Sequence, residues 1–225
     1  MPLAGRPLVE WSIAALRAAA GVRSIVVACP PGHAHDLDGD DLVMVDGGAT
    51  RAQSVANALA AVGTDLVAIH DAARPLVTPE LIEGVISTLT AAPDAAGAIA
   101  AVPVTDTIKR AASGPAPPGE TESRLQPFPH DGGEKAAICV GGTVDRGELW
   151  AAQTPQVFRV AALRRALEAD PAQVESATDE AMVVEAAGGR VLIHPASPEN
   201  LKVTTPLDLR VAELLLGAHP GRGSA

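Results

Sequence analysis

The regular alternation of short β-branched runs with longer amphipathic segments is the feature that most limits how this chain can fold. Such alternation predicts βα units and a mostly parallel sheet, which is an α/β fold. At 225 residues with 47% hydrophobic content, the chain can bury a full core, so we expect one domain over residues 1–225. The predicted strands are Ser24–Ala28, Leu42–Val45, Leu66–His70, Gly97–Val102 and Arg190–His194.

Capping residues mark where the helices begin. Thr50 and Gln53 form a capping-box pattern before a helix predicted over Arg51–Val62. Outside the predicted helices, the segment QTPQ at residues 153–156 is typical only of a turn or a cap. The other predicted helices span Pro7–Ala20, begin at Pro79 and at Pro206 after a threonine, and run from an N-cap at Thr178 to about Ala187.

A segment dense in proline, glycine and polar residues, Ala111–Gly133, has no hydrophobic period. This composition predicts a loop or a disordered insertion. Two short β-like pieces flank it, Thr107–Arg110 and Ala136–Val140, and they could pair as an arm that carries the segment at its tip. We therefore expect an arm with its insertion at about residues 107–146.

The formal net charge of −10 and the pI near 5.0 argue against a nucleic-acid partner and against a membrane surface. A small anionic ligand remains possible, since a pocket needs only a few local cations. The two cysteines, Cys29 and Cys139, form neither a disulfide framework nor a metal-binding spacing. No apolar run is long enough to span a membrane and no export signal is visible, so a reducing cytoplasm is the expected location.

The glycine pair Gly47-Gly48 stands between a predicted strand and a capped helix. Glycines let a flat ligand approach the backbone, and a helix start leaves N–H groups free to bind it. For a lone pair of glycines an ordinary βα turn is the favoured interpretation. Ser54, one turn into the helix, is by itself an ordinary surface serine.

The segment HDAARP at residues 70–75 follows the most apolar strand and so falls at the carboxyl edge of the sheet, where ligands of open α/β folds bind. Asp71 could hold a divalent cation there, and Arg74 could fork onto a phosphate. A salt bridge between these two residues is an equal alternative. Lys202, in an apolar extended stretch, is either a solvated strand residue or a point charge aimed at an anion.

Seven segments, taken in order, resemble the 2-C-methyl-D-erythritol 4-phosphate cytidylyltransferase family of the non-mevalonate isoprenoid pathway. They are VDGGATRAQSV, HDAARP, DTIK, TVDR, QTPQ, TDEA and NLKVT. The resemblance runs from about Leu3 to Leu216 and is interrupted by the proline-rich insertion. It implies a Rossmann-like nucleotidyltransferase sandwich with a protruding β-arm that embraces a second subunit, hence a homodimer.

The resemblance also implies roles for individual residues. Asp71 would lie beside the magnesium-bound triphosphate, and it would be the protein's ligand to Mg²⁺. Arg146 would reach the site of the neighbouring subunit, and the catalytic residues would be Arg146, Lys202 and Asp71. The implied nucleotide-binding residues are Gly47, Gly48, Ser54, Asp71 and Ala72; those for the sugar phosphate are Arg74, Thr107, Arg146, Thr154, Thr178 and Lys202.

The implied reaction transfers CMP from CTP to 2-C-methyl-D-erythritol 4-phosphate and releases pyrophosphate. Both reactants are anions, so the protein must bring them together and neutralise their charge. One alternative is an enzyme that cytidylylates ribitol 5-phosphate, which shares the same plan. Another is a truncated, inactive homologue that binds the sugar phosphate or dimerises without turning over CTP.

The family opens with a strand and a glycine-rich loop, whereas this chain starts at the segment Leu3–Leu8 that follows them. We therefore expect low activity at this length and two unpaired strand edges facing each other in the sheet. We also expect an in-frame glycine-rich segment upstream of Met1 in the gene.

Overall fold

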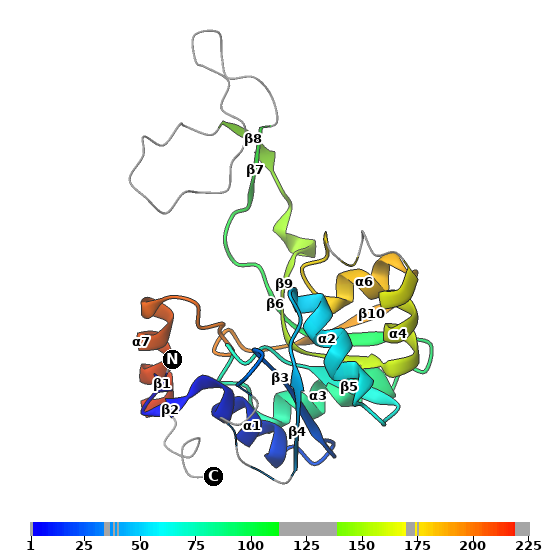
Figure 1. The fold of residues 1–225 in the computed structure, drawn as a ribbon. Coiled ribbons are helices and arrows are strands. Elements are labelled where there is room, and N and C mark those ends of the chain that lie inside the picture. The colour runs from blue at the N-terminus through cyan, green and yellow to red at the C-terminus, as the bar shows by residue number, and fades with distance from the viewer. Residues whose placement is uncertain are drawn as a thin grey trace. The chain divides into compact units, whose positions relative to one another are not determined.

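The computed structural model describes residues 2–33, 37, 39, 41–112, 139–169, 174 and 176–218. The chain divides into two compact units, which are described separately. The larger unit comprises Met1–Val102 and Ala152–Ala225, and the smaller one is Pro103–Ala151. Figure 1 shows the succession of helices and strands within each unit.

A four-stranded sheet forms the centre of the larger unit, with strand order β10-β6-β9-β5. β10 pairs parallel with β6, and Val191 lies opposite Gly97. β9 pairs antiparallel with β5, so the sheet is mixed rather than mostly parallel. The bounds are β5 Leu66–Ile69, β6 Gly97–Pro103, β9 Trp150–Arg159 and β10 Val191–Pro195.

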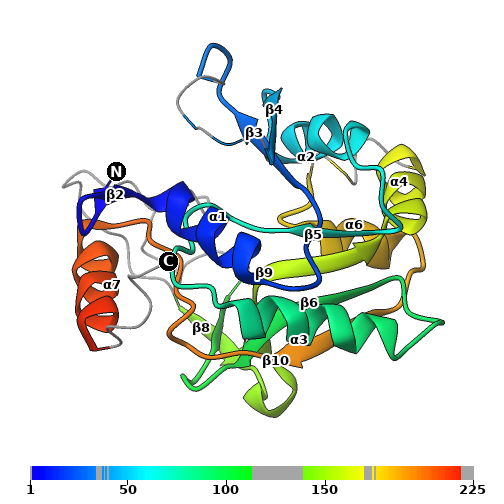
Figure 2. The ribbon, with the colours of Figure 1, turned by 90° about the horizontal axis from the view of Figure 1, so that it is seen from below.

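Helices cover both faces of this sheet because its strands are apolar on both sides. Phe158 and Val157, neighbours in β9, point to opposite faces and are both buried. Phe158 packs with α4 and α6, and Val157 packs with α3. Figure 2 shows α3 on one side of the sheet and α4 and α6 on the other. The helices are α1 Leu8–Ala18, α2 Arg51–Ala60, α3 Pro79–Thr90, α4 Val160–Ala169, α6 Glu180–Ala186 and α7 Pro206–Ala218.

Two further strands, β3 (Ile25–Cys29) and β4 (Leu42–Asp46), pair parallel to each other and form a separate sheet. Consecutive residues of two segments, Ser24–Ala28 and Asp65–Ala73, line one cavity of about 880 Å³. Consecutive residues point to opposite faces of a strand, so a cavity lined by them lies along the strand's edge. Among the described residues β3 pairs only with β4, and β5 only with β9, so their second edges both face this cavity. The expected pair of open edges is thus present.

All five predicted strands are present, and each end lies within one residue of its predicted position. The prediction for QTPQ was wrong, because these residues lie inside β9 and not in a turn. β9 and α4 had no counterpart in the predicted elements. QTPQ is polar and contains a proline, so its sequence does not indicate a strand. Tertiary contacts nevertheless bury the segment as part of β9.

Two predicted helix starts also need correction. Thr178 is not the N-cap of α6, because the side chain of Asp179 accepts the hydrogen bond from the Met182 backbone N–H. α1 begins at Leu8 and follows a small hairpin, β1 (Pro2–Leu3) with β2 (Arg6–Pro7). The hairpin turns at Gly5, whose φ of +81° favours glycine.

The smaller unit contains an antiparallel pair, β7 (Lys109–Ala111) with β8 (Val140–Thr143), and a short 3₁₀ turn, η1 (Arg146–Glu148). The first strand overlaps the arm piece predicted at Thr107–Arg110. Most of the second predicted piece, Ala136–Val140, and most of the insertion fall at residues 113–138, outside the described residues. Of the helices described in either unit, none is long and apolar enough to cross a membrane.

Candidate functional site

Asp71, just beyond the end of β5, is the centre of a cluster of charged side chains. Its Oδ2 lies 2.9 Å from Lys202 Nζ and 3.9 Å from Arg74 Nε. Its Oδ1 lies 3.6 Å from Arg51 Nη2. The Asp71 side chain is only 17% exposed, so these ion pairs are partly shielded from water. One carboxylate thus gathers three cations that are far apart in the sequence.

The surrounding cations keep Asp71 ionised. Burial alone would raise the pKa of its carboxyl group, but the hydrogen bond and the charge of Lys202, together with Arg51 and Arg74, outweigh burial and lower the pKa. Glu180 also pairs with Arg51, so Lys202 and Arg74 together carry one positive charge more than Asp71 balances. The cluster therefore favours an anionic ligand.

A chain of hydrogen bonds holds the turn that carries Asp71. The Asp71 backbone N–H donates to Thr154 Oγ1 over 3.0 Å, and Thr154 Oγ1 lies 3.0 Å from His70 Nδ1. His70 Nε2 lies 3.2 Å from the Arg74 carbonyl oxygen. A carbonyl only accepts, so Nε2 carries the proton and Nδ1 accepts from the Thr154 hydroxyl. Burial lowers the pKa of His70 to about 4, so the ring is neutral at pH 7.

The Arg74 guanidinium is anchored on a backbone carbonyl, and its side chain is only 11% exposed. Its Nη1 donates to the Asn200 carbonyl oxygen over 2.8 Å, and the buried Nε has no hydrogen-bond partner among the described residues. The Asn200 side chain donates in turn to Gln153 Oε1 and to the Thr154 carbonyl oxygen. Burial lowers the pKa of Arg74. A guanidinium held in this way supplies a fixed positive charge beside Asp71.

The glycine turn after β4 is held tightly against β3 and α2. Gly47 N–H donates to the Cys29 carbonyl oxygen over 2.6 Å, and Gly48 N–H donates to Ser54 Oγ over 3.0 Å. A Cβ at Gly47 would lie 3.0 Å from that carbonyl oxygen, so only glycine fits without a shift. The Ser54 hydroxyl donates to the Thr50 carbonyl oxygen. Thr50 also caps α2 by accepting from Gln53 N–H, as predicted.

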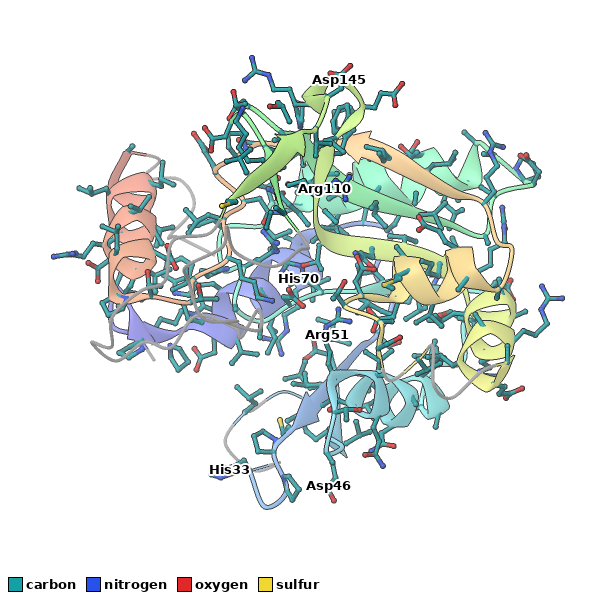
Figure 3. The ribbon with its side chains drawn as sticks, turned by 90° about the horizontal axis from the view of Figure 1, so that it is seen from above. His33, Asp46, Arg51, His70, Arg110 and Asp145 are labelled. Carbon is teal, nitrogen blue, oxygen red and sulfur yellow. The ribbon has the colours of Figure 1, made fainter. Side chains whose placement is uncertain are left out.

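Arg51 and Glu180 lie within the motifs VDGGATRAQSV and TDEA, and their pairing was not predicted from the sequence. Arg51 Nη1 lies 2.5 Å from Glu180 Oε1, and Glu180 is only 2% exposed. Figure 3 shows Arg51, at the start of α2, beside His70, at the end of β5. The signal in the sequence is a carboxylate that stands among the apolar residues of α6, because a glutamate on a buried helix face needs a partner. His70, Gln156 and Asn200 were likewise overlooked as structural supports of the site.

The sequence-predicted residues fall into three groups. Asp71, Arg74, Thr154 and Lys202 lie together in the cluster. Gly47 and Gly48 precede Arg51, which contacts Asp71, and Ser54 lies one turn further along α2. Exposed Ala72 lines the same cavity as Ser54, Asp71 and Lys202. Exposed Thr178 stands two residues before Glu180. Thr107 and Arg146 belong to the smaller unit, where both are exposed and Arg146 donates to the Thr105 carbonyl oxygen.

The fold and the charged cluster together define a class of protein. A strand end, two helix starts and a glycine turn meet at a cation-rich site, which is where open α/β sheets bind phosphate-bearing ligands. Asp71 is an ionised carboxylate that could offer an oxygen to a metal, but the described residues contain no group of three possible metal ligands. The class is therefore that of α/β proteins that bind phosphorylated small molecules.

Comparison with known proteins narrows this class to one family. The family model for 2-C-methyl-D-erythritol 4-phosphate cytidylyltransferase matches residues 1–125 and 133–218. A cytidylyltransferase of that name from Cereibacter sphaeroides is 42% identical over 229 residues, covering 98% of this chain and 88% of the relative. Another, from Ralstonia nicotianae, is 39% identical over 236 residues, covering 97% of this chain and 84% of the relative.

Solved structures agree with the sequence relatives. The crystal structure of 2-C-methyl-D-erythritol 4-phosphate cytidylyltransferase from Thermus thermophilus has a TM-score of 0.72 and 36% identity, with 95% of this chain and 90% of that chain covered. The synthase from Anaerococcus prevotii has a TM-score of 0.76 at 21% identity over 96% of this chain and 92% of that chain, which supports the fold alone. This chain belongs to the 2-C-methyl-D-erythritol 4-phosphate cytidylyltransferase family, and the Rossmann-like α/β fold predicted from the sequence is confirmed.

Proposed function

We propose that this chain transfers CMP from CTP to 2-C-methyl-D-erythritol 4-phosphate and releases pyrophosphate. The observation that carries the proposal is the cluster of Arg51, Arg74 and Lys202 around the ionised Asp71. Two mutually repelling phosphates can approach each other only where fixed positive charge offsets their repulsion. In the reaction an oxygen of the sugar phosphate bonds to the α-phosphorus of CTP, and the bond to the β-phosphate oxygen breaks, so that its electron pair leaves with pyrophosphate.

The nucleotide is proposed to bind between the glycine turn and the end of β5. Gly47 and Gly48 carry no side chains of their own, so the base can approach their backbone closely. Ser54 supports the turn by accepting from Gly48 N–H, while Ala72 and Asp71 flank the ribose and the triphosphate. These roles agree with Ser54, Asp71 and Ala72 lining a common cavity.

The sugar phosphate is proposed to bind to Lys202 and Arg74, close to Thr178. Lys202 is 46% exposed and can turn from Asp71 to an arriving phosphate, while Arg74, anchored on the Asn200 carbonyl oxygen, supplies a fixed positive charge. The Thr154 hydroxyl already contacts His70 and the Asp71 backbone, so its proposed role is to stabilise the turn that carries Asp71. Thr107 and Arg146 of the arm complete the set, and Arg146 acts on the site of a neighbouring subunit.

Mg²⁺ is proposed to bind together with the triphosphate of CTP, with Asp71 as its ligand from the protein. Mg²⁺ commonly keeps several waters and binds through one or two carboxylates together with substrate phosphates, so a single carboxylate suits it. When bound, the ion would neutralise charge on the leaving pyrophosphate. Asp71, already ionised, can provide an oxygen once Lys202 has turned to the phosphate.

The larger unit and the arm are proposed to act as one functional domain over residues 1–225, in a homodimer built through the arm. A cytoplasmic location is proposed from the composition, which has few cysteines and a strong negative charge. Neither Cys29 nor Cys139 forms a disulfide. The proposed partners are CTP and methylerythritol phosphate, with neither nucleic acid nor membrane involved.

The direct test is pyrophosphate release by the purified chain with CTP, Mg²⁺ and either methylerythritol phosphate or ribitol 5-phosphate. We expect release with the first polyol phosphate and little with the second. Lys202→Met should reduce kcat/KM by roughly 10²- to 10³-fold, because one fixed cation is lost at the reacting phosphates. Arg190→Met is the control, since Arg190 is an exposed cation of the larger unit that pairs with Asp94, and it should stay within about twofold of wild type.

Preference for ribitol 5-phosphate would assign the chain to the other cytidylyltransferase activity. Micromolar binding of CTP by calorimetry without any pyrophosphate release would instead favour a binding or dimerising protein. Equal activity of Lys202→Met and wild type would contradict the role of the cation cluster.

A further inference from the structure

Arg51 stands apart from the other two cations because a second carboxylate holds it. Its Nη2 faces Asp71 Oδ1 at 3.6 Å, while its Nη1 is bound by Glu180 Oε1 at 2.5 Å. Lys202 and Arg74 both approach the other oxygen of Asp71. Among the described residues, Arg51 is therefore the one cation that faces Oδ1.

Glu180 is a rigid anchor for Arg51. It is the first residue of α6 and is 2% exposed. Asp179, directly before it, caps the helix and accepts a hydrogen bond of 2.8 Å from the Gln156 side chain in the central strand β9. The start of α6 is thus tied to the core sheet. A carboxylate fixed in this way can hold a guanidinium in one orientation.

The helix that carries Arg51 also fixes its position. It is the first residue of α2, directly after the N-cap Thr50, whose side chain accepts from Gln53 N–H. The glycine turn Gly47-Gly48 immediately precedes this cap. Arg51 therefore connects the start of α2 to Asp71 and to the start of α6, where Thr178 lies two residues before Glu180.

We propose that Arg51 and Glu180 form a positioning pair that keeps Asp71 oriented while Lys202 turns to a substrate phosphate. The proposal rests on the proposed function. Lys202 is 46% exposed and contacts Asp71 without being held by a second carboxylate in the described residues, so an arriving phosphate can draw it away. Arg74 stays in place because its Nη1 donates to the Asn200 carbonyl oxygen. Arg51 stays on Asp71 because Glu180 retains its other nitrogen. The pair also links the nucleotide end of the site to the sugar-phosphate end.

The test compares Arg51→Lys, Glu180→Gln and the double variant Arg51→Met/Glu180→Met with wild type. Lysine keeps the charge but has one nitrogen, so it cannot bridge Asp71 and Glu180 as a fork does. We expect Arg51→Lys to lower kcat by about 10- to 100-fold while KM for both substrates changes less than about threefold, because misplacement of a catalytic group affects the chemical step. Glu180→Gln should lower kcat in the same direction by a smaller factor.

The double variant separates positioning from folding. Arg51→Met alone leaves Glu180 buried and unpaired, so it should lower the urea midpoint of unfolding. Removing both charges should restore that midpoint but not kcat. Arg190→Lys and Glu185→Gln are the controls, because Arg190 pairs with Asp94 on the surface and Glu185 is an exposed residue of the same helix. Both should retain wild-type kcat.

The outcomes distinguish this proposal from the proposed function. If Arg51→Lys raises KM alone, Arg51 binds substrate directly and the positioning role is wrong. If kcat recovers in the double variant, the pair serves only folding. If wild type releases no pyrophosphate, the proposed function fails, and crystal structures decide the positioning role. Rotation of the Asp71 carboxylate in the double variant would then support it, and an unchanged Asp71 with Lys202 still at 2.9 Å would refute it.

Discussion

At the scale of single residues, His70 supports the site through its neutral ring. It accepts from Thr154 on one side and donates to the Arg74 carbonyl oxygen on the other, and so closes the turn that presents Asp71. Protonation would turn Nδ1 into a second donor, so the Thr154 hydroxyl would have to rotate and accept from it instead of donating. The geometry of the turn therefore depends on pH through one imidazole.

We predict that stability falls as the pH is lowered from about 6.5 to about 4 because of His70. Its pKa of about 4 in the folded state lies below the ordinary value of 6.5. The unfolded chain therefore binds the proton more readily in this range, and the folded state loses on the order of 3 kcal/mol at most by pH 4. Above about pH 7 the contribution of His70 is constant.

Urea unfolding at a series of pH values measures this effect, and the ring carbon shifts of His70 in NMR give its pKa directly. His70→Gln can still accept and donate in the same directions but does not titrate. The difference in unfolding free energy between wild type and His70→Gln should therefore change across this pH range. A difference independent of pH, or a measured pKa near 6.5, would contradict the prediction.

At the scale of elements, the turn between β4 and α2 depends on close backbone approach. A Cβ at Gly47 would stand 3.0 Å from the Cys29 carbonyl oxygen and 3.2 Å from Ser54 Oγ. Since the first of these is a backbone atom, it cannot move without shifting β3. A side chain at this position would therefore require the turn or β3 to shift by a few tenths of an ångström.

We predict that Gly47→Ala lowers the free energy of unfolding by roughly 1–3 kcal/mol and weakens CTP binding, because the added methyl group separates the turn from β3. Gly63→Ala is the matched control, since a Cβ at Gly63 meets no atom within 4 Å, and it should change stability by less than about 1 kcal/mol. Chemical denaturation and calorimetric CTP titration measure the two effects. Equal behaviour of the two variants would rule out the close approach as the cause.

At the scale of the larger unit, the β3-β4 pair and the four-stranded sheet are separated by the cavity of about 880 Å³. β6, by contrast, lies between β10 and β9, and its residues Gly97 to Ala101 are all buried. Every residue of β5 is half-buried although all four are apolar. Packing is therefore much tighter on the β6 side of the sheet than beside the cavity.

We predict that backbone amides of β6 exchange with deuterium orders of magnitude more slowly than the amides of β3 and β5 that face the cavity. Exposed amides without a partner exchange by local fluctuation, whereas amides paired in the core require larger opening. Hydrogen exchange measured by NMR or mass spectrometry tests this difference. Uniform protection across β3, β5 and β6 would show that the two open edges are covered in solution.

Local patterns in the sequence determined the strands, the Thr50 cap, the glycine turn and the placement of Asp71 at a strand end, because each depends on neighbours a few residues away. The tertiary structure decided the rest. β9 is a strand because buried partners surround a polar segment, and Asp179 rather than Thr178 caps α6. Arg51 meets Glu180 across 129 residues of sequence. Residues so far apart are joined only by folding, since the free energy of a buried ion pair depends on distance and shielding, which no local pattern encodes.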